Sequence, residues 1–590
     1  MKKLLDLLTA EMGQAFAAAG YDAALGKVSV SNRPDLCEYQ CNGAMAGAKQ
    51  YKKAPIMIAN EVAKELQGGK VFAEVNAVAP GFLNLKLSEE FLAKYIGEME
   101  AADKFGLEKP AKPKKIIIDY GGANVAKPLH VGHIRSAVIG ESIKRICRYA
   151  GHEVIGDVHL GDWGLQMGLV ITGVQDRQPD LPYFDENFTG EYPAEAPFTI
   201  SELEKIYPAA SAKSKEDPAY KARAMEATFK LQSGVRGYRA LWKHILNVSV
   251  ADLKKNYGSL NVEFDLWKGE SDVHDIIPDM VKYMKEGGYA YISDGALVVD
   301  VKEETDTKEM PPCMILKSDG ASLYNTTDLA TIMERMKLYH PDKLIYVVDK
   351  RQDLYFEQVF RCARKTKLVE PETELKFLGF GTMNGKDGKP FKTRDGGVMR
   401  LENLIADTKE EMYRKIKEGR EMSDEEAQAV ADIVAVSALK YGDLSNQASK
   451  DYIFDIDRFT SFEGDTGPYI LYTIVRIKSI LAKYKEQGGD LEAAKKALCA
   501  AENESEKALQ MQIAGFNAMM ETACEELAPH KVCAYIYDLA NAFNHFYHET
   551  KILAEENAER KAGLIALLML TRDVLEACID VLGFEAPEKM

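Results

Sequence analysis

Apolar and polar residues follow two different periods along the first part of the chain, which indicates interleaved helices and strands. Over residues 56–66, apolar side chains recur at the spacing of one helix face. Residues 81–87 instead alternate apolar and polar side chains, as in a strand with one buried face. We therefore predict a small α/β domain over residues 1–110, which ends at a Pro- and Lys-rich connector, Lys109 to Pro113.

The following segment has the element order of a larger α/β domain. A β-branched run at 116–118 precedes the turn Gly121-Gly122, and a helical pattern follows over about residues 130–150. Further apolar stretches predicted as strands alternate with helical patterns: 153–158, 296–301 and 343–348. Strands that alternate with helices favour parallel sheets. We predict a doubly wound (Rossmann-like) parallel-sheet domain over residues 111–400, with an insertion at about 176–260.

Beyond residue 400 the pattern is almost wholly helical. In the stretch 533–550 the apolar residues Leu539, Phe543 and Phe546 fall on one helical face. We predict a helical stem over residues 401–460 and an all-α bundle over residues 461–590. The whole chain is thus expected to be a multidomain α/β protein.

Composition excludes several classes of protein. The chain has 590 residues with 46% hydrophobic and 28% charged residues, typical of a large globular protein with about three to five domains. Its net charge of -16 argues against a generally sticky nucleic-acid binder, yet residues 112–150 carry eight Lys or Arg against two acidic residues. No stretch approaches the ~18 apolar residues of a membrane span. We expect no contact with membranes.

The nine cysteines form no C-x-x-C pair, and no His cluster has the spacing of zinc ligands. This pattern is typical of reduced thiols in a cytoplasmic protein. We expect no bound zinc and no organic prosthetic group.

The most specific motif runs from Asn124 to His133, between a predicted strand and a predicted helix. His130 and His133 are three residues apart at the helix start, where free backbone N–H groups and the helix dipole favour phosphate. Gly132 between them leaves space for a nucleotide against the backbone. A lone H-x-x-H pair is more often surface polarity, but the strand before it and the helix after it favour a phosphate site.

This motif resembles a known family. His130-Val-Gly-His133 is similar to the HIGH signature of class I aminoacyl-tRNA synthetases, and the longer string from Ala123 resembles its arginyl-tRNA synthetase form. The runs Gly161–Gly164 and Tyr324–Ala330 and the C-terminal end resemble the same family. The resemblance implies that ATP and arginine form arginyl-adenylate with release of pyrophosphate, and that the arginyl group then passes to the terminal ribose of its tRNA.

The family's second signature, a mobile KMSKS-type loop, has only a degenerate counterpart at Gly388–Gly397. Lys389, Lys392 and Arg394 are its candidate cations for the ATP phosphates. The residues expected to bind ATP are His130, Gly132, His133 and Lys392. The resemblance implies that Lys127, upstream of the HIGH string, offsets the weakened loop. ATP is expected to bind with Mg²⁺.

The resemblance also implies the arginine contacts. Asp328 is expected to bind the guanidinium, with Tyr324 beside it at the i, i+4 spacing of a helix face. Asn124 and Gln352 are expected at the polar ends of the amino acid. Asp119, at the end of the first predicted strand, is an extra candidate acid. Without the motif, Asp328 would be interpreted as a helix acid stabilised by the macrodipole.

The outer domains are expected to contact tRNA. By resemblance, residues 1–110 form the added domain that meets the corner of the tRNA, and residues 461–590 form the α-helical anticodon-binding domain. The chain is expected to be a monomer. Two alternatives stay open: another class I synthetase, for cysteine or glutamine, and an inactive RNA-binding paralogue.

Overall fold

A computed structural model describes residues 1–391 and 398–590. The chain divides into two compact units, which are described separately. Unit 1 contains residues 1–110, 462–580 and 585–590, and unit 2 contains residues 111–461 and 581–584.

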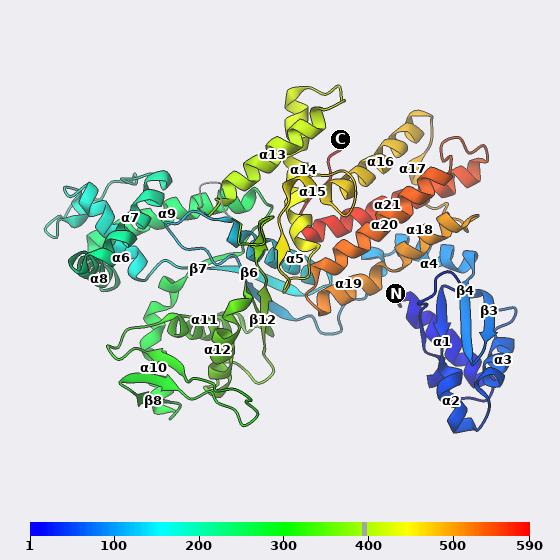
Figure 1. The fold of residues 1–590 in the computed structure, drawn as a ribbon, viewed down its shortest axis with the longest axis horizontal. Coiled ribbons are helices and arrows are strands. Elements are labelled where there is room, and N and C mark those ends of the chain that lie inside the picture. Colours follow the sequence, from blue (N-terminus) through cyan, green and yellow to red (C-terminus); the bar gives the residue numbers. More distant parts are fainter. Residues whose placement is uncertain (392–397) are drawn as a thin grey trace. The chain divides into compact units, whose positions relative to one another are not determined.

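Unit 2 is built on a five-stranded parallel sheet (Figure 1). In spatial order its strands are β12 (Glu374–Phe380), β11 (Lys343–Asp349), β5 (Lys115–Asp119), β6 (Glu153–Leu160) and β7 (Leu266–Gly269). The central strands are apolar on both faces, as Ile117, Ile118 and Ile345 show, because both faces are covered. The predicted doubly wound parallel sheet is confirmed.

Helices cover the two faces of this sheet. On one side α5 (Ile134–Tyr149) packs against β5, β6 and β11. On the other, Ile117 and Leu344 share a core cluster with α10 (Ile277–Glu286), α11 (Tyr324–Tyr339) and α12 (Asp353–Lys365). The chain adds β6 and β7 on one side of β5, and later β11 and β12 on the other. The carboxyl ends of β5 and β11 therefore form the point where the strand order reverses, the usual ligand crevice of such sheets.

The predicted strand 296–301 does not join the parallel sheet. It forms β9 (Ala296–Val299) in a separate antiparallel sheet with β8 (Ala290–Ser293) and β10 (Cys313–Leu316). Asp294 and Gly295 join β8 to β9 with φ angles of 50° and 81°. An Asp-Gly pair with positive φ at both residues forms a tight hairpin turn, which pairs β9 with its own predecessor.

The insertion is helical. Between β6 and β7 the chain forms α6 (Leu165–Arg177), α7 (Ile200–Glu216), α8 (Pro218–Gln232) and α9 (Arg236–Gly258). Thr199 and Glu202 cap the start of α7 reciprocally, and Asp217 caps α8 ahead of Pro218. These helices enclose a core of their own, which includes Trp163, Tyr238 and Leu241.

The last part of unit 2 returns to helix. It contains α13 (Leu401–Lys417), α14 (Asp424–Leu444) and the short α15 (Ile456–Phe459). A two-stranded parallel pair, β13 (Met383–Asn384) with β14 (Tyr452–Ile453), ties this part to the end of β12.

The N-terminal part of unit 1 is a four-stranded antiparallel sheet with helices. The strand order is β1 (Val28–Val30), β2 (Tyr39–Cys41), β4 (Phe82–Leu87) and β3 (Phe72–Val78). The helices are α1 (Leu4–Ala18), α2 (Gly43–Tyr51), α3 (Pro55–Glu65) and α4 (Glu89–Ala101). The helix and strand expected at 56–66 and 81–87 correspond to α3 and β4.

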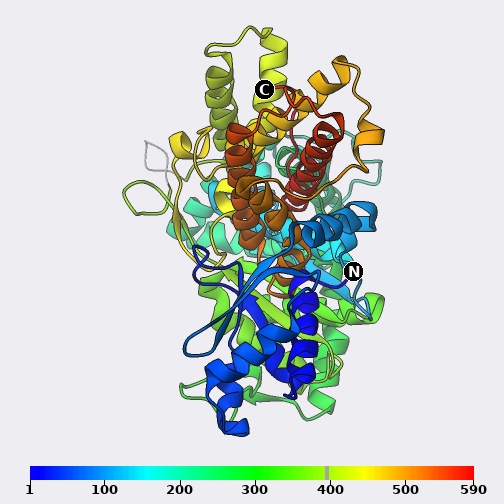
Figure 2. The same ribbon diagram turned by 90° about the vertical axis from the view of Figure 1, so that its right-hand side faces the viewer.

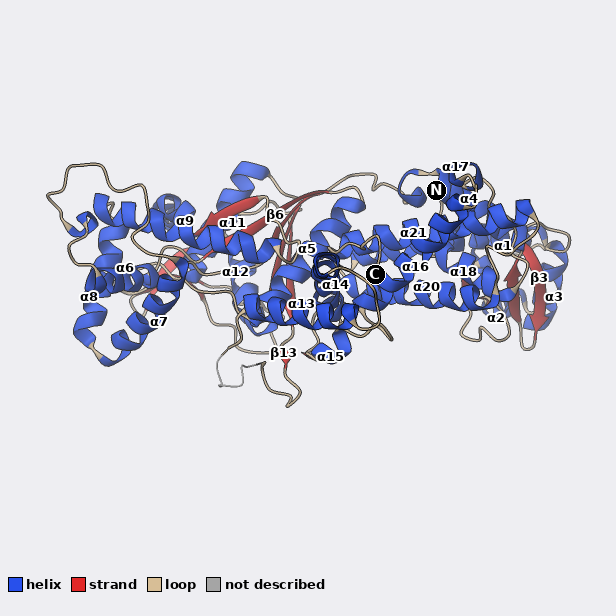
Figure 3. Ribbon diagram, turned by 90° about the horizontal axis from the view of Figure 1, so that it is seen from above, coloured by secondary structure: helices blue, strands red, loops and turns tan. Residues whose placement is uncertain are grey.

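The C-terminal part of unit 1 is a helical bundle (Figure 3). Its helices are α16 (Gly467–Glu486), α17 (Leu491–Ala494), α18 (Glu504–Ala514), α19 (Phe516–Glu525), α20 (Pro529–Glu549) and α21 (Ala558–Leu582). Leu539, Phe543 and Phe546 are all buried, as their spacing predicted. None of the helices in the described ranges is long and apolar enough to cross a lipid bilayer.

The two parts of unit 1 are far apart in sequence but packed together. Helix α4 contacts α18. The small sheet contacts α18 through Lys507 of that helix, whose Nζ lies 2.9 Å from Glu38 Oε1 and donates to the Leu87 carbonyl at 2.7 Å. Phe105 and Phe516 meet edge to face. Figure 2 shows the blue N-terminal segment together with the orange and red C-terminal helices.

One buried arginine joins α11 to three adjacent strands of the parallel sheet. Arg335 Nη2 donates to Asp119 of β5 at 2.7 Å and to Asp157 of β6 at 2.9 Å. Its Nη1 donates to the hydroxyl of Tyr346 in β11 at 3.2 Å. The arginine side chain is only 2% exposed, so removal of this charge would leave two carboxylates buried without their partner.

The Arg335→Met variant is therefore expected to destabilise unit 2 by about 3–5 kcal/mol, because uncompensated buried charges are costly. The triple variant Arg335→Met/Asp119→Asn/Asp157→Asn should recover part of that loss, since no unpaired charge remains. Urea unfolding followed by tryptophan fluorescence measures both. The three tryptophans all lie in unit 2: Trp163, Trp242 and Trp267. An unchanged unfolding midpoint in the single variant would contradict the expectation.

Candidate active site

The two predicted histidines stand at the start of α5 and are held by backbone hydrogen bonds. His130 Nδ1 accepts from the Gly132 N–H at 3.1 Å, and His133 Nδ1 accepts from the His130 N–H at 3.1 Å. The ring centroids are 4.0 Å apart. A Cβ at Gly132 would lie 2.8 Å from the His130 ring, so the glycine admits that ring. Because Nδ1 accepts in both rings, each neutral imidazole carries its proton on Nε2.

Burial keeps both histidines uncharged near neutral pH. It lowers the pKa of His133 to about 4, with the neighbouring His130 as a second cause. Burial and, next, the charge of Lys127 lower the pKa of His130. Both side chains are therefore neutral hydrogen-bond donors rather than cations.

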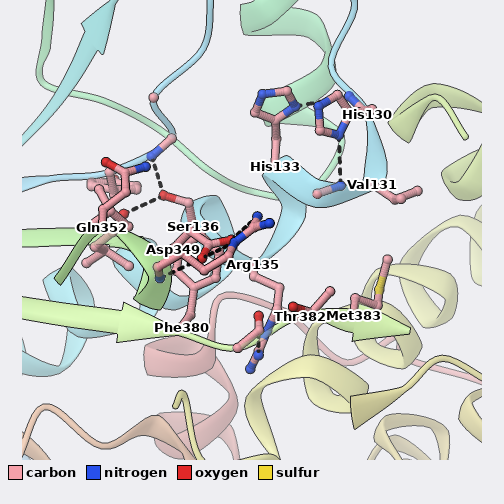
Figure 4. A pocket seen from close by; sticks show the side chains of 18 of the residues that line it. His130, Val131, His133, Arg135, Ser136, Asp349, Gln352, Phe380, Thr382 and Met383 are labelled. Carbon is pink, nitrogen blue, oxygen red and sulfur yellow. Dashed lines mark hydrogen bonds and ion pairs between the residues drawn. The ribbon is translucent and has the colours of Figure 1, made fainter. Parts of the chain in front are cut away.

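A first pocket of about 500 Å³ opens where the strand order reverses. It is lined by the ends of β5 and β11, the His130–Ser136 segment and the end of β12 (Figure 4). His130 and His133 lie on one side of it and Gln352 on the opposite side. Such a crevice at the carboxyl ends of parallel strands, next to a helix start, suits a nucleotide phosphate.

Ser136 fixes the base of the first pocket. Its hydroxyl accepts from the Gly121 N–H at 2.8 Å and donates to the Val347 carbonyl at 2.8 Å. Gly121 has a φ of 89° and Gly122 a φ of 48°, so the turn after β5 uses backbone conformations that favour glycine. One hydroxyl thus ties the ends of β5 and β11 together.

A second pocket of about 460 Å³ is also lined by the loop that follows β5. Asn124 and Lys127 of that loop line it, and so do Tyr207, Glu270 and Tyr324. Lys127 Nζ is 4.5 Å from the centre of the Tyr207 ring, a cation–π contact. Tyr324, the first residue of α11, is 74% exposed. The described structure therefore divides the predicted residues between two neighbouring pockets.

Asp328 lies one helical turn beyond Tyr324 on α11, as the i, i+4 spacing predicted. Its Oδ2 accepts a hydrogen bond from the Tyr355 hydroxyl, and its Oδ1 lies 3.9 Å from His159 Nε2. Burial raises the pKa of Asp328, whereas His159 and the Tyr355 bond lower it. Asp328 is not among the residues that line the two pockets in the described chain.

The remaining candidates have different surroundings. Asp119 and Gln352 border the first pocket, but the Asp119 carboxylate already pairs with Arg335. Lys389 is exposed on a turn in which its N–H donates to Asp387. Lys392 and Arg394 lie outside the described residues.

The chain just after that basic loop is hydrogen-bonded to the histidine segment. Pro390, Phe391 and Val398 line the first pocket. Val131 N–H donates to the Met399 carbonyl at 2.9 Å, and Leu401 N–H donates to the Leu129 carbonyl at 2.9 Å.

Two acids of the site carried no recognisable signal in the sequence. Glu270 lines the second pocket, and burial together with the charges of Asp162 and Asp328 raises its pKa to about 7. Asp162 accepts from the N–H and hydroxyl of Ser271 at 3.0 and 2.6 Å, which fixes the residue next to Glu270. A buried acid whose pKa is raised by two nearby carboxylates lies in a negative environment that favours a cation. Asp162 lies in the run Gly161–Gly164, which the sequence marks only through its resemblance to the family. No pattern in the sequence distinguishes Glu270 from any other polar residue after a strand.

Within residues 1–391 and 398–590, no group of three or more His, Cys, Asp or Glu side chains is placed to hold a metal ion. The lining of the first pocket is more apolar than polar, and its polar side chains include His130, His133, Ser136 and Gln352.

Three family models match successive parts of the chain. The model of the class I (R) tRNA synthetase catalytic domain matches residues 99–456. The arginyl tRNA synthetase N-terminal domain matches residues 2–87, and the DALR anticodon-binding domain matches residues 470–590.

Full-length relatives give the same result. An arginine–tRNA ligase of Agathobacter rectalis is 64% identical over 597 aligned positions, and one of Alkaliphilus oremlandii is 58% identical. Both alignments cover 100% of each chain. The solved arginyl-tRNA synthetases of Plasmodium falciparum and Thermus thermophilus have the same fold, with TM-scores of 0.81 and 0.76 over 100% of both chains, at 24% and 23% identity.

The match to the catalytic-domain model and the identity to these relatives agree with the pocket beside the His130–His133 segment, and the chain belongs to the class I arginyl-tRNA synthetase family.

Proposed function

We propose that the protein attaches arginine to its tRNA in two steps, with ATP as the energy source. The observation that carries this proposal is that one loop borders two pockets. Residues 130–133 line the first pocket, and Asn124 and Lys127 line the second. A nucleotide in one pocket and an amino acid in the other would meet at this loop, as the formation of an aminoacyl-adenylate requires.

In the first step the carboxylate of arginine attacks the α-phosphorus of ATP and pyrophosphate leaves. Charge develops on the equatorial oxygens and on the pyrophosphate, so donors fixed beforehand stabilise the transition state more than the ground state. The Nε2–H groups of His130 and His133 are such donors, since their Nδ1 atoms are held by the backbone. Lys389, Lys392 and Arg394 supply cations as pyrophosphate departs. Mg²⁺ neutralises phosphate charge when bound.

Arginine is selected by two acids: Glu270, which lines the second pocket, and Asp328, one helical turn beyond the Tyr324 that lines it. Asp328 and Glu270 bind the guanidinium, whose planar donors match carboxylates, and Tyr324 packs beside it. Asn124 binds the amino-acid end from the second pocket and Gln352 from the first. Asp119 acts through its ion pair with Arg335, which holds the helix that carries Tyr324 and Asp328.

In the second step a hydroxyl of the terminal ribose of tRNA attacks the arginyl carbonyl, and AMP leaves. Residues 1–110 contact the corner of the tRNA and residues 461–590 the anticodon region. Aromatic and Arg side chains on such domains stack on splayed bases and bind phosphates. The protein acts as a monomer in the cytoplasm, without zinc or a prosthetic group.

Charging of total tRNA with each of the twenty amino acids in parallel tests the proposal. Arginine alone should be attached, and only with ATP and Mg²⁺ present. Attachment of cysteine or glutamine instead would identify another class I synthetase. Tight tRNA binding without any charging would identify an inactive RNA-binding paralogue.

Asp328→Asn is expected to lower kcat/KM for arginine by the equivalent of about 1.5–3 kcal/mol, because a charge-assisted hydrogen bond is lost. The KM for ATP should change little. Glu334→Gln is a matched control on the same helix, since Glu334 lies 3.9 Å from Lys268, whereas Asp328 faces His159 and Tyr355. Steady-state kinetics compare the two variants, and equal KM values for arginine would remove Asp328 from the site.

His133 is expected to stay neutral down to about pH 4. Its pKa in the folded chain lies below the ordinary value of 6.5, so the unfolded chain binds more protons between these pH values. The contribution of His133 to stability should thus fall as pH drops from 6.5 to about 4. Carbon-13 NMR of labelled histidine measures the titration, with His133→Gln to assign the signal. A midpoint near 6.5 would show that the ring is not buried as described.

A further inference from the structure

His159 occupies the carboxyl end of β6, beside Asp328. Its Nε2 lies 3.9 Å from Asp328 Oδ1, and the two side chains are only 14% and 18% exposed. The other oxygen of Asp328 already accepts from Tyr355. His159 therefore faces the one carboxylate oxygen that Tyr355 leaves free for a second donor.

Both ring nitrogens of His159 are covered and lack a hydrogen-bond partner among the described residues. Buried polar atoms are nearly always paired, so an unpaired imidazole marks a place where a partner is missing or moves. The nearest ionic partner is Asp328. Hydrogen bonds of a catalytic site are often long without substrate and tighten in the complex.

Both groups lie among other charges. Burial lowers the pKa of His159, so the imidazole is neutral and carries a single N–H. The charged or titratable groups that act on His159 or Asp328 come from every neighbouring element: Asp119, Asp157, Glu270, Asp272, Cys313, Tyr324, Arg335, Tyr346 and Tyr355. Most of these groups are acids or phenols, which makes an ionised Asp328 costly without donors.

We propose that His159 is a positioning residue for arginine recognition, whose Nε2–H turns onto Asp328 Oδ1 and, with Tyr355 on Oδ2, holds the carboxylate ionised and oriented toward the guanidinium. This inference rests on the proposed function, because only a cationic substrate requires that negative charge. The guanidinium shares Oδ1 with His159, since each carboxylate oxygen accepts two hydrogen bonds.

The donor hydrogen, rather than the bulk of the ring, is the property that matters. His159→Leu keeps an apolar side chain of similar size but removes the N–H. His159→Gln keeps an amide N–H that can reach the same oxygen. A residue that only fills space would tolerate leucine at least as well as glutamine, whereas the proposed residue tolerates only glutamine.

The test is the pH profile of kcat/KM for arginine in the full-length enzyme, measured between about pH 5.5 and 8.5. Loss of a donor to the ionised form raises the pKa of Asp328, so the acid limb of His159→Leu should move up by about one pH unit. That shift corresponds to an about tenfold loss in kcat/KM at the acid end, which shrinks as pH rises. His159→Gln should keep the wild-type profile. Because the charge of Asp328 also acts on Glu270, the shift is measured as the difference between His159→Leu and His159→Gln, which differ only in the donor at position 159.

Two further variants sharpen the result. Tyr355→Phe removes the other donor and should move the acid limb in the same direction. His152→Leu, which alters the residue just before the other end of β6, should leave the profile unchanged. An equal, pH-independent loss in His159→Leu and His159→Gln, or an unshifted limb in His159→Leu, would overturn the proposal. Failure of the wild-type enzyme to charge arginine would instead overturn the proposed function.

Discussion

The site of unit 2 depends on one guanidinium. Arg335 binds groups on three adjacent strands, β11, β5 and β6, from the helix that carries Tyr324 and Asp328. The strands set where the nucleotide-sized pocket opens, and the helix sets where the acids for a cationic substrate stand. Because an ion pair without its partner is costly in a protein interior, helix and strand ends keep one relative position. Asp119 holds the helix and the strand ends together through its ion pair with Arg335 and is not a free acid.

The regular elements could largely be predicted from the sequence, because burial imposes a period on each of them. The helix face of Phe543 and Phe546 and the buried run of β5 show this clearly. The predicted strand 296–301 belongs to a different sheet from the one expected, because an apolar run does not specify its partner strand. The Asp294-Gly295 turn specifies it, through backbone angles that favour a local hairpin.

The sequence predicts only part of the candidate site. His130 and His133 have a spacing and a position before a helix that point to phosphate chemistry. Glu270 and His159 have no such pattern, since their roles arise from burial beside Asp328, which lies far away in sequence. Their significance follows from the desolvation of charge and from unpaired atoms, properties that exist only after folding.

Unit 1 combines the two ends of the chain, and this affects when it can fold during synthesis. Its N-terminal sheet and α4 pack against α18 and α19, which begin more than 400 residues after α4 ends. At roughly 5–20 residues per second, synthesis of the intervening segment takes about 20 to 80 s. Throughout that interval the surface around Glu38, Leu87 and Phe105 has no partner from its own chain. Unit 1 therefore closes only after the ribosome has made nearly the whole protein, and this surface is where a nascent-chain chaperone would be needed most.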